Sequence, residues 1–301
     1  MGESADLSKA GAPPLVSIVV PVWNGEAVIG RCLEAIGRQT YPRDRMQVLV
    51  VDNGSSDRTA EIVATFAFAT LLREDEPSSY RARNAGLRAA AGEYVAFTDA
   101  DCAPEPDWLA AGVEAALEHP EAGIIAGAIE FIDSATPSAC ERYDRLFGGF
   151  NQERNAAEGF CVTANWLSRR EALLAHGGFR DDLKSVGDAE LSRRIHAAGK
   201  KVRFAPRMRV RHPPRTELRE QVSRSVRIVG GRWSRDRAHR GLPEWAWILS
   251  REAAGCVRRA ALTRSFALAD KVQVSGVALV LYAAGMAEIV RLAAGGAPRR
   301  A

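Results

Sequence analysis

The fold is decided by one stretch of the sequence, Gly92-Glu93-Tyr94-Val95-Ala96-Phe97-Thr98-Asp99-Ala100-Asp101. Its first two residues are a turn signal, and residues 94–98 have the aromatic, β-branched and small side chains of a buried strand. Two aspartates follow this strand. Because residues i and i+2 of an extended segment project to the same side, Asp99 and Asp101 can reach one cation. The alternative is a solvated turn that carries two acids.

The residues before this stretch repeat a cycle of strand, turn and helix. The sequence predicts strands over 16–20, 47–51 and 68–72, and helices over 26–38, 58–65 and 79–91. Repeated strand–helix units predict an α/β fold with a mostly parallel sheet flanked by helices. Ligands of such sheets bind at the carboxyl ends of the strands. Asp52 follows the second strand and is therefore either a ligand group or a helix cap.

Composition limits the function classes. The chain has 301 residues, of which 47% are hydrophobic and 26% charged, and this excludes a disordered protein. Its net charge of +4 hides two halves, because residues 193–264 alone carry 20 Lys or Arg against 5 Asp or Glu, net +15. The small total disfavours nucleic-acid binding. Five cysteines without a C-x-x-C pair, and no visible signal peptide, favour a reducing compartment, the cytoplasm.

Four segments match a known family in order and spacing. They are residues 16–26, the turn 51–57, Ala82-Arg83-Asn84-Ala85-Gly86, and residues 92–101. Together they resemble the family 2 glycosyltransferases, inverting enzymes of GT-A fold that use a nucleotide-sugar donor. The resemblance implies a GT-A α/β fold with a mostly parallel central sheet, here followed by a helical C-terminal extension. It also implies a hexosyltransferase-like activity that transfers a sugar to an acceptor hydroxyl.

The resemblance implies roles for particular side chains. The nucleotide-sugar-binding set is Pro21, Trp23, Glu26, Asp52, Arg83 and Asp99. Within this set, residues 21–26 line the base and ribose, and Asp52 contacts the base. Asp99 and Asp101 form the D-x-D pair, in which Asp101 is the direct metal ligand. Mg²⁺ or Mn²⁺ held there would neutralise the diphosphate leaving group without proton transfer.

Three other nucleotide-binding classes are disfavoured. No G-x-G-x-x-G follows the first predicted strand, which argues against a dinucleotide-binding dehydrogenase. No P-loop motif occurs, which argues against a P-loop ATPase. A nucleotidyltransferase would need a Gly-rich basic loop after the first strand, and residues 22–26 do not supply one.

A second block supplies the candidate general base. Residues 177–183 and 187–195 resemble the family's acceptor-side segment, in which Gly-Gly-Phe precedes an acidic pair that opens a helix. Asp188 matches the base, whereas Gly187 stands where the family often has Glu. Asp188 could instead be only a helix N-cap. The reserve candidates for the base are Glu190, Asp181 and Asp182.

Four residues have weaker assignments. Asn165 and Trp166 lie where the family places acceptor-facing residues, and Glu190 is a third acceptor candidate. Trp166 could stack on a sugar ring or lie in the core. His212, which follows residues 202–206, matches a histidine after the last strand of the family's domain that in some relatives holds the metal or diphosphate. Otherwise it is a surface or capping residue.

The C-terminal region differs in character from the rest. We predict a flexible N-terminus over residues 1–13, a glycosyltransferase domain over 14–214, and a basic helical region over 215–301. Arg232-Trp233 matches the end of the Gln-x-x-Arg-Trp signature of processive members, but Val229 stands where Gln is required. A processive polymerase is therefore not supported.

The arginines of this region and its apolar segments suggest a membrane surface. The arginines could contact the diphosphate, bind anionic lipid, or form a solvated face. The apolar segment 272–290 has an uncharged core over 272–287, short of the ~20 residues that a spanning helix needs. Basic residues beside Trp-rich segments are typical of an interfacial helix. A packed helical hairpin, or embedding through 272–290, are the alternatives.

The sequence thus predicts an inverting glycosyltransferase peripheral on the inner face of the cell membrane. Its partners would be a nucleotide-diphospho-sugar, an acceptor that is a glycan, lipid or small molecule, and an anionic membrane surface, and not nucleic acid. Synthesis of a cell-envelope polysaccharide or glycolipid would suit this location. The alternative is an inactive nucleotide-binding or scaffold protein of the same fold. Neither the sugar, the base nor the acceptor follows from any local pattern.

Overall fold

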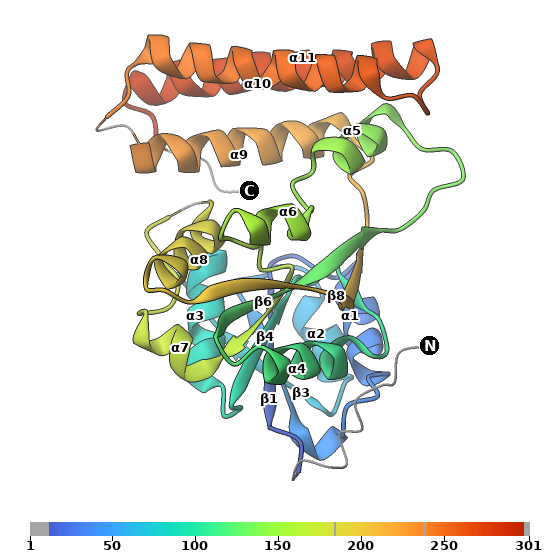
Figure 1. Cartoon of the computed structure of the whole chain (residues 1–301), viewed down its shortest axis with the longest axis vertical. Helices are drawn as coiled ribbons and strands as arrows, with labels where there is room; N and C mark the ends of the chain where they lie inside the picture. The colour runs from blue at the N-terminus through green and yellow to red at the C-terminus, as the bar shows by residue number, and fades with distance from the viewer. Residues whose placement is uncertain (1–11, 184, 237–238, 298–301) are drawn as a thin grey trace. The chain divides into compact units, whose positions relative to one another are not determined.

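The computed structural model describes residues 12–183, 185–236 and 239–297 (Figure 1). It divides into two compact units. The sheet unit contains the chain up to 130 together with 150–181 and 187–213, and the helical unit contains 131–149, 182–186 and the chain from 214 onward. The flexible N-terminus predicted for 1–13 falls almost entirely on residues 1–11, outside the described residues. The domain boundary at 214 stays a prediction.

Within the described residues the sheet unit is built on an eight-stranded sheet of order β3-β2-β1-β4-β7-β6-β8-β5. The strands are β1 (Val16–Val22), β2 (Met46–Asp52), β3 (Ala69–Arg73), β4 (Tyr94–Thr98), β5 (Ala103–Pro104), β6 (Ala122–Phe131), β7 (Asn165–Arg169) and β8 (Lys201–His212). β1 pairs in parallel with β2 and β4, and β2 with β3, whereas β7 is antiparallel to β4 and β6. All four predicted strands are present, with ends shifted by at most two residues.

Helices cover this sheet as the strand–helix alternation predicts. They are α1 (Ile29–Gly37), α2 (Thr59–Ala64), α3 (Ser79–Ala89), α4 (Trp108–Glu118), α6 (Gln152–Ala157), α7 (Arg170–Ala175) and α8 (Gly187–Ala197), with a 3-10 turn, η2, at Arg43–Arg45. Every residue of β1 except Pro21 is buried, as expected for a parallel strand covered on both faces. A Cβ at Gly86 of α3 would overlap the side chain of Val19, so glycine here lets the helix approach β1 closely.

The helical unit consists of α5 (Ala139–Phe147), α9 (Leu218–Asp236), α10 (Leu242–Leu262) and α11 (Leu268–Ala293). α11 packs against α5, α9 and α10 (Figure 1). Val229, Trp245, Leu249 and Ile289 form a small core between α9, α10 and α11. The carboxylate of Asp144 on α5 is buried and lies 3.2 Å from the guanidinium of Arg215.

Candidate active site

The loop after β1 and the turn after β2 are joined by hydrogen bonds. The Glu26 amide donates to the Asp57 carboxylate (3.0 Å), and the Glu26 carboxylate accepts from the Arg58 amide (3.1 Å). Asp57 also accepts from the Thr59 amide at 3.1 Å, although Arg58, not Asp57, is the N-cap of α2. Glu26 therefore shapes the loop that carries Trp23, whose residue surface is 45% exposed.

Asp52 is the last residue of β2 and is buried. Its Oδ1 accepts from the Ser55 amide at 2.9 Å, which closes the turn. Its Oδ2 is buried and has no hydrogen-bond partner among the described residues. A buried acceptor without a partner is costly, so this atom suits a ligand that brings an N–H group.

Asn53 follows Asp52 and fixes the loop that leads into α3. Its side-chain amide donates to the carbonyls of Glu74 and Glu76, both at 2.8 Å, and its carbonyl accepts from the Ser78 amide at 2.8 Å. An ionised aspartate at this position could accept the bond from the Ser78 amide but could not donate the two bonds to the carbonyls. The asparagine, which the sequence indicated only as a turn former, thus holds the start of the helix that carries Arg83.

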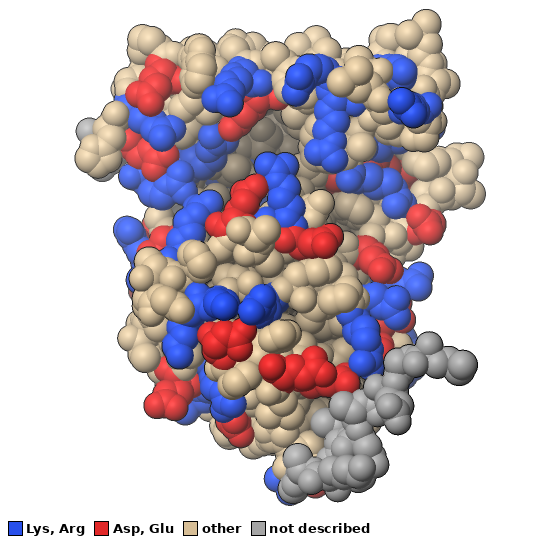
Figure 2. Space-filling view, in the orientation of Figure 1, with Lys and Arg blue, Asp and Glu red and all other residues tan. Residues whose placement is uncertain are grey.

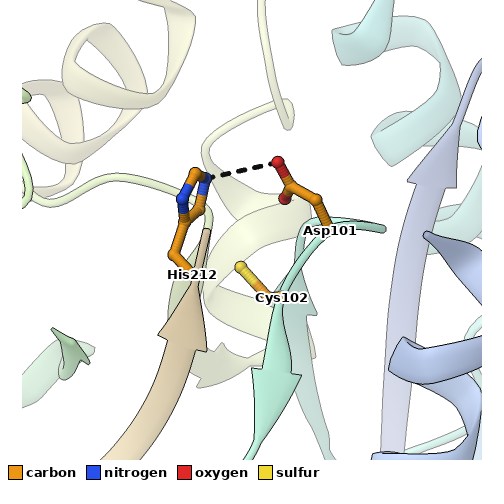
Figure 3. Close-up of side chains that lie close together, drawn as sticks. All are labelled: Asp101, Cys102 and His212. Carbon is orange, nitrogen blue, oxygen red and sulfur yellow. Dashed lines mark ion pairs between the residues drawn. The ribbon is translucent and has the colours of Figure 1, made fainter. Parts of the chain in front are cut away.

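The two acids after β4 have different partners. Asp99 forms an ion pair with Arg83 of α3, whose Nη2 lies 2.6 Å from Oδ1. Asp101 instead faces His212 at the end of β8, with 3.4 Å between Oδ2 and Nε2 (Figure 3). The D-x-D pair is therefore divided: one carboxylate contacts a buried guanidinium and the other contacts an imidazole.

The imidazole of His212 has a defined orientation. Its Nδ1 lies 2.6 Å from the carbonyl oxygen of Pro213, which can only accept, so Nδ1 carries a hydrogen. Nε2 is then the nitrogen that faces Asp101. A backbone carbonyl on the far nitrogen is the usual support of a metal-ligating histidine. Asp101, Cys102 and His212 each offer one donor atom, and these atoms lie within 4.8 Å of one another.

Asp188 lies in the first turn of α8. Its Oδ1 accepts from the Ala189 amide at 2.9 Å. Burial raises the pKa of Asp188 above its ordinary value, and Asp99 also raises it, while the Ala189 amide and Arg83 lower it. A carboxylate with a raised pKa is a stronger base than an exposed one. The arrangement accordingly suits proton abstraction.

The glycine before Asp188 has a physical reason. A Cβ at Gly187 would lie 2.8 Å from ring atoms of Tyr80, so this site has no room for the Glu of the family pattern. The Gly187 amide donates to the Tyr80 hydroxyl at 2.8 Å. α3 also holds the preceding segment, because Asn84 accepts from the Phe179 amide and donates to its carbonyl at 2.9 and 2.8 Å. No local sequence pattern indicated the role of Tyr80.

The two residues predicted to face the acceptor, Asn165 and Trp166, are not exposed to solvent. Asn165 is fully buried, accepts from the Trp108 indole and donates to the carbonyls of Ala128 and Met208, each at 2.8 Å. Trp166 is also fully buried, and its indole donates to Ser168 at 2.7 Å. Both side chains are engaged inside the sheet unit, so they are left out of the site proposed below.

The reserve acids also have partners. Glu190 lies 2.8 Å from Arg194 of the same helix. Asp181 lies 3.7 Å from Arg81 of α3. Asp182 belongs to the helical unit. Glu190 and Asp181 are half-buried, as Asp188 is, but each is paired with an arginine, and Asp182 is exposed.

The family model of Glycosyl transferase family 2 matches residues 17–177, more than half of the chain. The chain belongs to glycosyl transferase family 2. This family 2 protein is 34% identical to glycosyltransferase AglE of Haloferax volcanii over 74% of this chain and 76% of AglE. It is 28% identical to the probable glycosyltransferase YdaM of Bacillus subtilis over 64% of this chain, and the match spans about half the length of YdaM (49%).

Solved structures show the fold of this family 2 protein. The mannosyltransferase PcManGT from Pyrobaculum calidifontis, in complex with GDP-Man and Mn²⁺, superposes with a TM-score of 0.62 at 24% identity, over 93% of this chain and 87% of that one. S. aureus TarS 1–349 in complex with UDP-GlcNAc gives 0.56 at 16% identity, over 95% and 93%. The predicted GT-A fold and the prediction of a glycosyltransferase are confirmed.

Proposed function

We propose that this glycosyltransferase moves a sugar from a nucleotide-diphospho-sugar to an acceptor hydroxyl with inversion, and that Asp188 is the general base. The observation that carries this proposal is a cluster of groups in the sheet unit: the Oδ2 of Asp52, which has no partner among the described residues, the Arg83–Asp99 pair, Asp101 beside His212, and the half-buried Asp188 with its raised pKa. A scaffold protein has no need of an aspartate with a raised pKa beside these groups.

The nucleotide would bind along the ends of β1 and β2. Oδ2 of Asp52 can accept a hydrogen bond from an N–H group of the base. Trp23, in the loop directly after β1, offers an exposed aromatic face. The similar structures of PcManGT and TarS contain GDP-Man and UDP-GlcNAc. A single carboxylate acceptor can bind either a purine or a pyrimidine base, so experiment must decide which nucleotide base the protein binds.

The donor atoms of Asp101 and His212 fit a divalent cation. They supply one carboxylate oxygen and one oriented imidazole nitrogen at 3.4 Å from each other. Mg²⁺ or Mn²⁺ bound there would offset the negative charge that develops on the departing diphosphate. The PcManGT structure contains Mn²⁺. Arg83 forms an ion pair with Asp99 and so holds this carboxylate in place beside the site.

Asp188 would take the proton of the acceptor hydroxyl as its oxygen attacks the anomeric carbon, on the face opposite the diphosphate. Attack from that face inverts the configuration. Because Asp188 is fixed by the Ala189 amide and its raised pKa strengthens it as a base, it can accept the proton without a second group.

Two substitutions test the assignment in purified full-length protein screened against nucleotide-sugars with Mn²⁺. Asp188→Asn should lower kcat by about 10²–10⁴-fold and leave nucleotide affinity unchanged. Asp101→Ala should weaken Mn²⁺-dependent nucleotide binding as well as transfer. Asp133→Asn, an exposed acid of the helical unit, is the control and should change neither. Turnover at the wild-type rate in both site variants would overturn the proposal. If the wild-type protein binds nucleotide but transfers no sugar, the result would favour a scaffold.

We also propose that the helical unit lies on an anionic membrane surface at the cytoplasmic face. Within the described residues one helix, α11, is long and apolar enough to cross a membrane. Its inner face packs on α9 and α10, while its outer face exposes Val272, Leu279, Val280 and Val290. Such a helix, apolar outside and packed inside, suits the interface better than a span.

α10 adds an aromatic and basic face to this surface. It exposes Trp247 (60%) and Leu262 (70%), and the guanidinium of Arg251 lies 5.3 Å from the Trp247 ring centroid. Arg258 is exposed further along the helix. Figure 2 shows Lys and Arg side chains among uncharged surface on the helical unit. Tryptophan and arginine together are typical of contact with anionic headgroups.

Vesicle co-sedimentation tests the membrane proposal. The wild-type chain should bind vesicles that contain anionic lipid more strongly than zwitterionic ones, and less at high salt. Arg251→Glu with Arg258→Glu should reduce binding to anionic vesicles, and Leu279→Ser should reduce binding to both. Leu117→Ser, at an exposed leucine of the sheet unit (46% against 55% for Leu279), is the matched control. Equal binding by all variants, or none by the wild type, would contradict the proposal.

A further inference from the structure

Cys102 lies beside the proposed metal ligands because of the register of two strands. β5 is antiparallel to β8, with Ala103 opposite Arg211 and Pro104 opposite Val210. Continued by one pair, this register places Cys102 opposite His212. Residues directly opposite in an antiparallel pair have side chains on the same face. The thiol and the imidazole therefore lie on one side of the sheet, and both residues are buried (Figure 3).

The separations suit coordination of one ion. Two ligands that each lie ~2.1 Å from a tetrahedral ion are ~3.4 Å apart. The Asp101 oxygen and the His212 Nε2 are 3.4 Å apart. A thiolate at ~2.3 Å from the same ion would lie ~3.6 Å from each of them. The donor atoms of Asp101, Cys102 and His212 already lie within 4.8 Å of one another, so a side-chain movement of ~1 Å completes the set.

The chemistry of the three donors favours one class of cation. Carboxylate oxygen and imidazole nitrogen suit Mn²⁺, whereas the addition of sulfur favours Zn²⁺ and other thiophilic ions. The Pro213 carbonyl on Nδ1 of His212 fixes the ring with Nε2 toward the site. Cys32 is another fully buried thiol near this site, but its sulfur lies 3.7 Å from the backbone carbonyl of Asp99 and outside the cluster.

We propose that Asp101, Cys102 and His212 form a site for a thiophilic divalent cation such as Zn²⁺, with the Cys102 thiolate as the third protein ligand. The thiol releases its proton to solvent as the sulfur–metal bond forms. This inference rests on the proposed function, because Asp101 and His212 are also the proposed ligands of Mg²⁺ or Mn²⁺. Because its third protein ligand is sulfur, Zn²⁺ displaces Mn²⁺ from this site. A cation held by three protein groups has fewer coordination positions left for diphosphate oxygens, so the bound Zn²⁺ inhibits transfer.

Co²⁺ is the spectroscopic probe for this site in the full chain without nucleotide. Binding to the wild type should produce a sulfur-to-cobalt charge-transfer band in the near ultraviolet, which added Zn²⁺ abolishes. Cys102→Ser should bind Co²⁺ without this band, and the matched control Cys32→Ser should retain it. Mn²⁺ and Co²⁺ uptake is measured in parallel by calorimetry on each protein.

Inhibition gives the second readout. At fixed Mn²⁺, the Zn²⁺ concentration that halves transfer, relative to each protein's own uninhibited rate, should rise at least ~10-fold in Cys102→Ser. Cys32→Ser should follow the wild type. Co²⁺ uptake without the band, or equal Zn²⁺ sensitivity in Cys102→Ser, would show that Cys102 is only a core residue and overturn the inference alone. Absence of both Mn²⁺ and Co²⁺ uptake by the wild type would overturn the proposed metal site itself.

Discussion

Tyr80 offers a sharp test of how Asp188 is positioned. Its hydroxyl accepts from the Gly187 amide at 2.8 Å, and its ring stacks on Phe179 with centroids 5.9 Å apart. Gly187 is the first residue of α8, so its amide has no partner within the helix. Tyr80→Phe removes one oxygen atom and keeps the ring. The substitution therefore separates the hydrogen bond from the packing.

The size of the effect follows from the unpaired amide. A buried N–H left without an acceptor costs about 1–3 kcal/mol. For a domain of about 150–250 residues, the size of the sheet unit, each kcal/mol lowers Tm by about 2–4 °C, so Tyr80→Phe should melt at least ~2 °C below the wild type. Release of the helix start should also displace Asp188, and a shift of about 1 Å can cost up to ~100-fold in rate. We expect kcat to fall at least ~10-fold while the donor KM stays within about twofold.

Tyr94→Phe is the matched control. Tyr94 is also buried, but its hydroxyl has no hydrogen-bond partner among the described residues. Removal of that oxygen relieves an unsatisfied polar group, so Tm should stay constant or rise, and kinetics should not change. If Tyr80→Phe behaves like Tyr94→Phe, the hydrogen bond does not hold the helix. If Tyr80→Phe lowers Tm but leaves kcat unchanged, Tyr80 is structural and does not position Asp188.

Three further outcomes are expected. Asp52→Asn keeps an oxygen for the turn but replaces the partnerless acceptor with a donor, so calorimetry should show nucleoside diphosphate affinity at least ~10-fold weaker; unchanged affinity would exclude Asp52 from base contact. Burial raises the pKa of Asp188, so the folded state binds its proton more tightly than the unfolded state, and stability from this group is lost as pH rises above the unfolded pKa of ~3.9. Asp188→Asn should therefore melt above the wild type at pH 7, by a margin that shrinks toward pH 4, and a lower Tm at pH 7 would contradict this. Gly187→Glu should abolish transfer because its side chain meets the Tyr80 ring, and Tyr80→Ala should partly restore folding, measured as Tm; no recovery would argue against the clash.

The parts of the fold that the sequence predicted are those with a local cause. Residues 94–98 form β4 as predicted, because a short apolar run between a turn signal and an acid pair has few other structures. An acid just before a predicted helix is a common N-cap, yet the Asp57 carboxylate accepts from the Glu26 amide, and Arg58 takes the N-cap position of α2. That contact joins residues 31 positions apart, which no local pattern reports.

In the site, too, the sequence predicts what has a local cause and misses what depends on contacts between distant segments. Asp52, Asp99 and Asp101 follow predicted strands, so the sequence places them at one sheet edge. Trp166 enters the core because β7 pairs antiparallel with β4, opposite Phe97, and this pairing joins segments about 70 residues apart. Cys102 was counted only as evidence about redox compartment. Its place beside His212 depends on the register of β5 and β8, which lie far apart in the chain.

One helix accounts for much of the site's geometry. Residues three and four apart share a helix face, and α3 places Tyr80, Arg83 and Asn84 in this relation. Arg83 contacts Asp99, Asn84 holds Phe179, and Tyr80 holds Gly187. Gly86 sets the distance of this helix from β1. The Arg-Asn-Ala-Gly segment is thus explained by its contacts. One short helix connects Asp99 after β4 to the start of α8, which carries the proposed base Asp188, so the same element positions the proposed donor-side and acceptor-side groups.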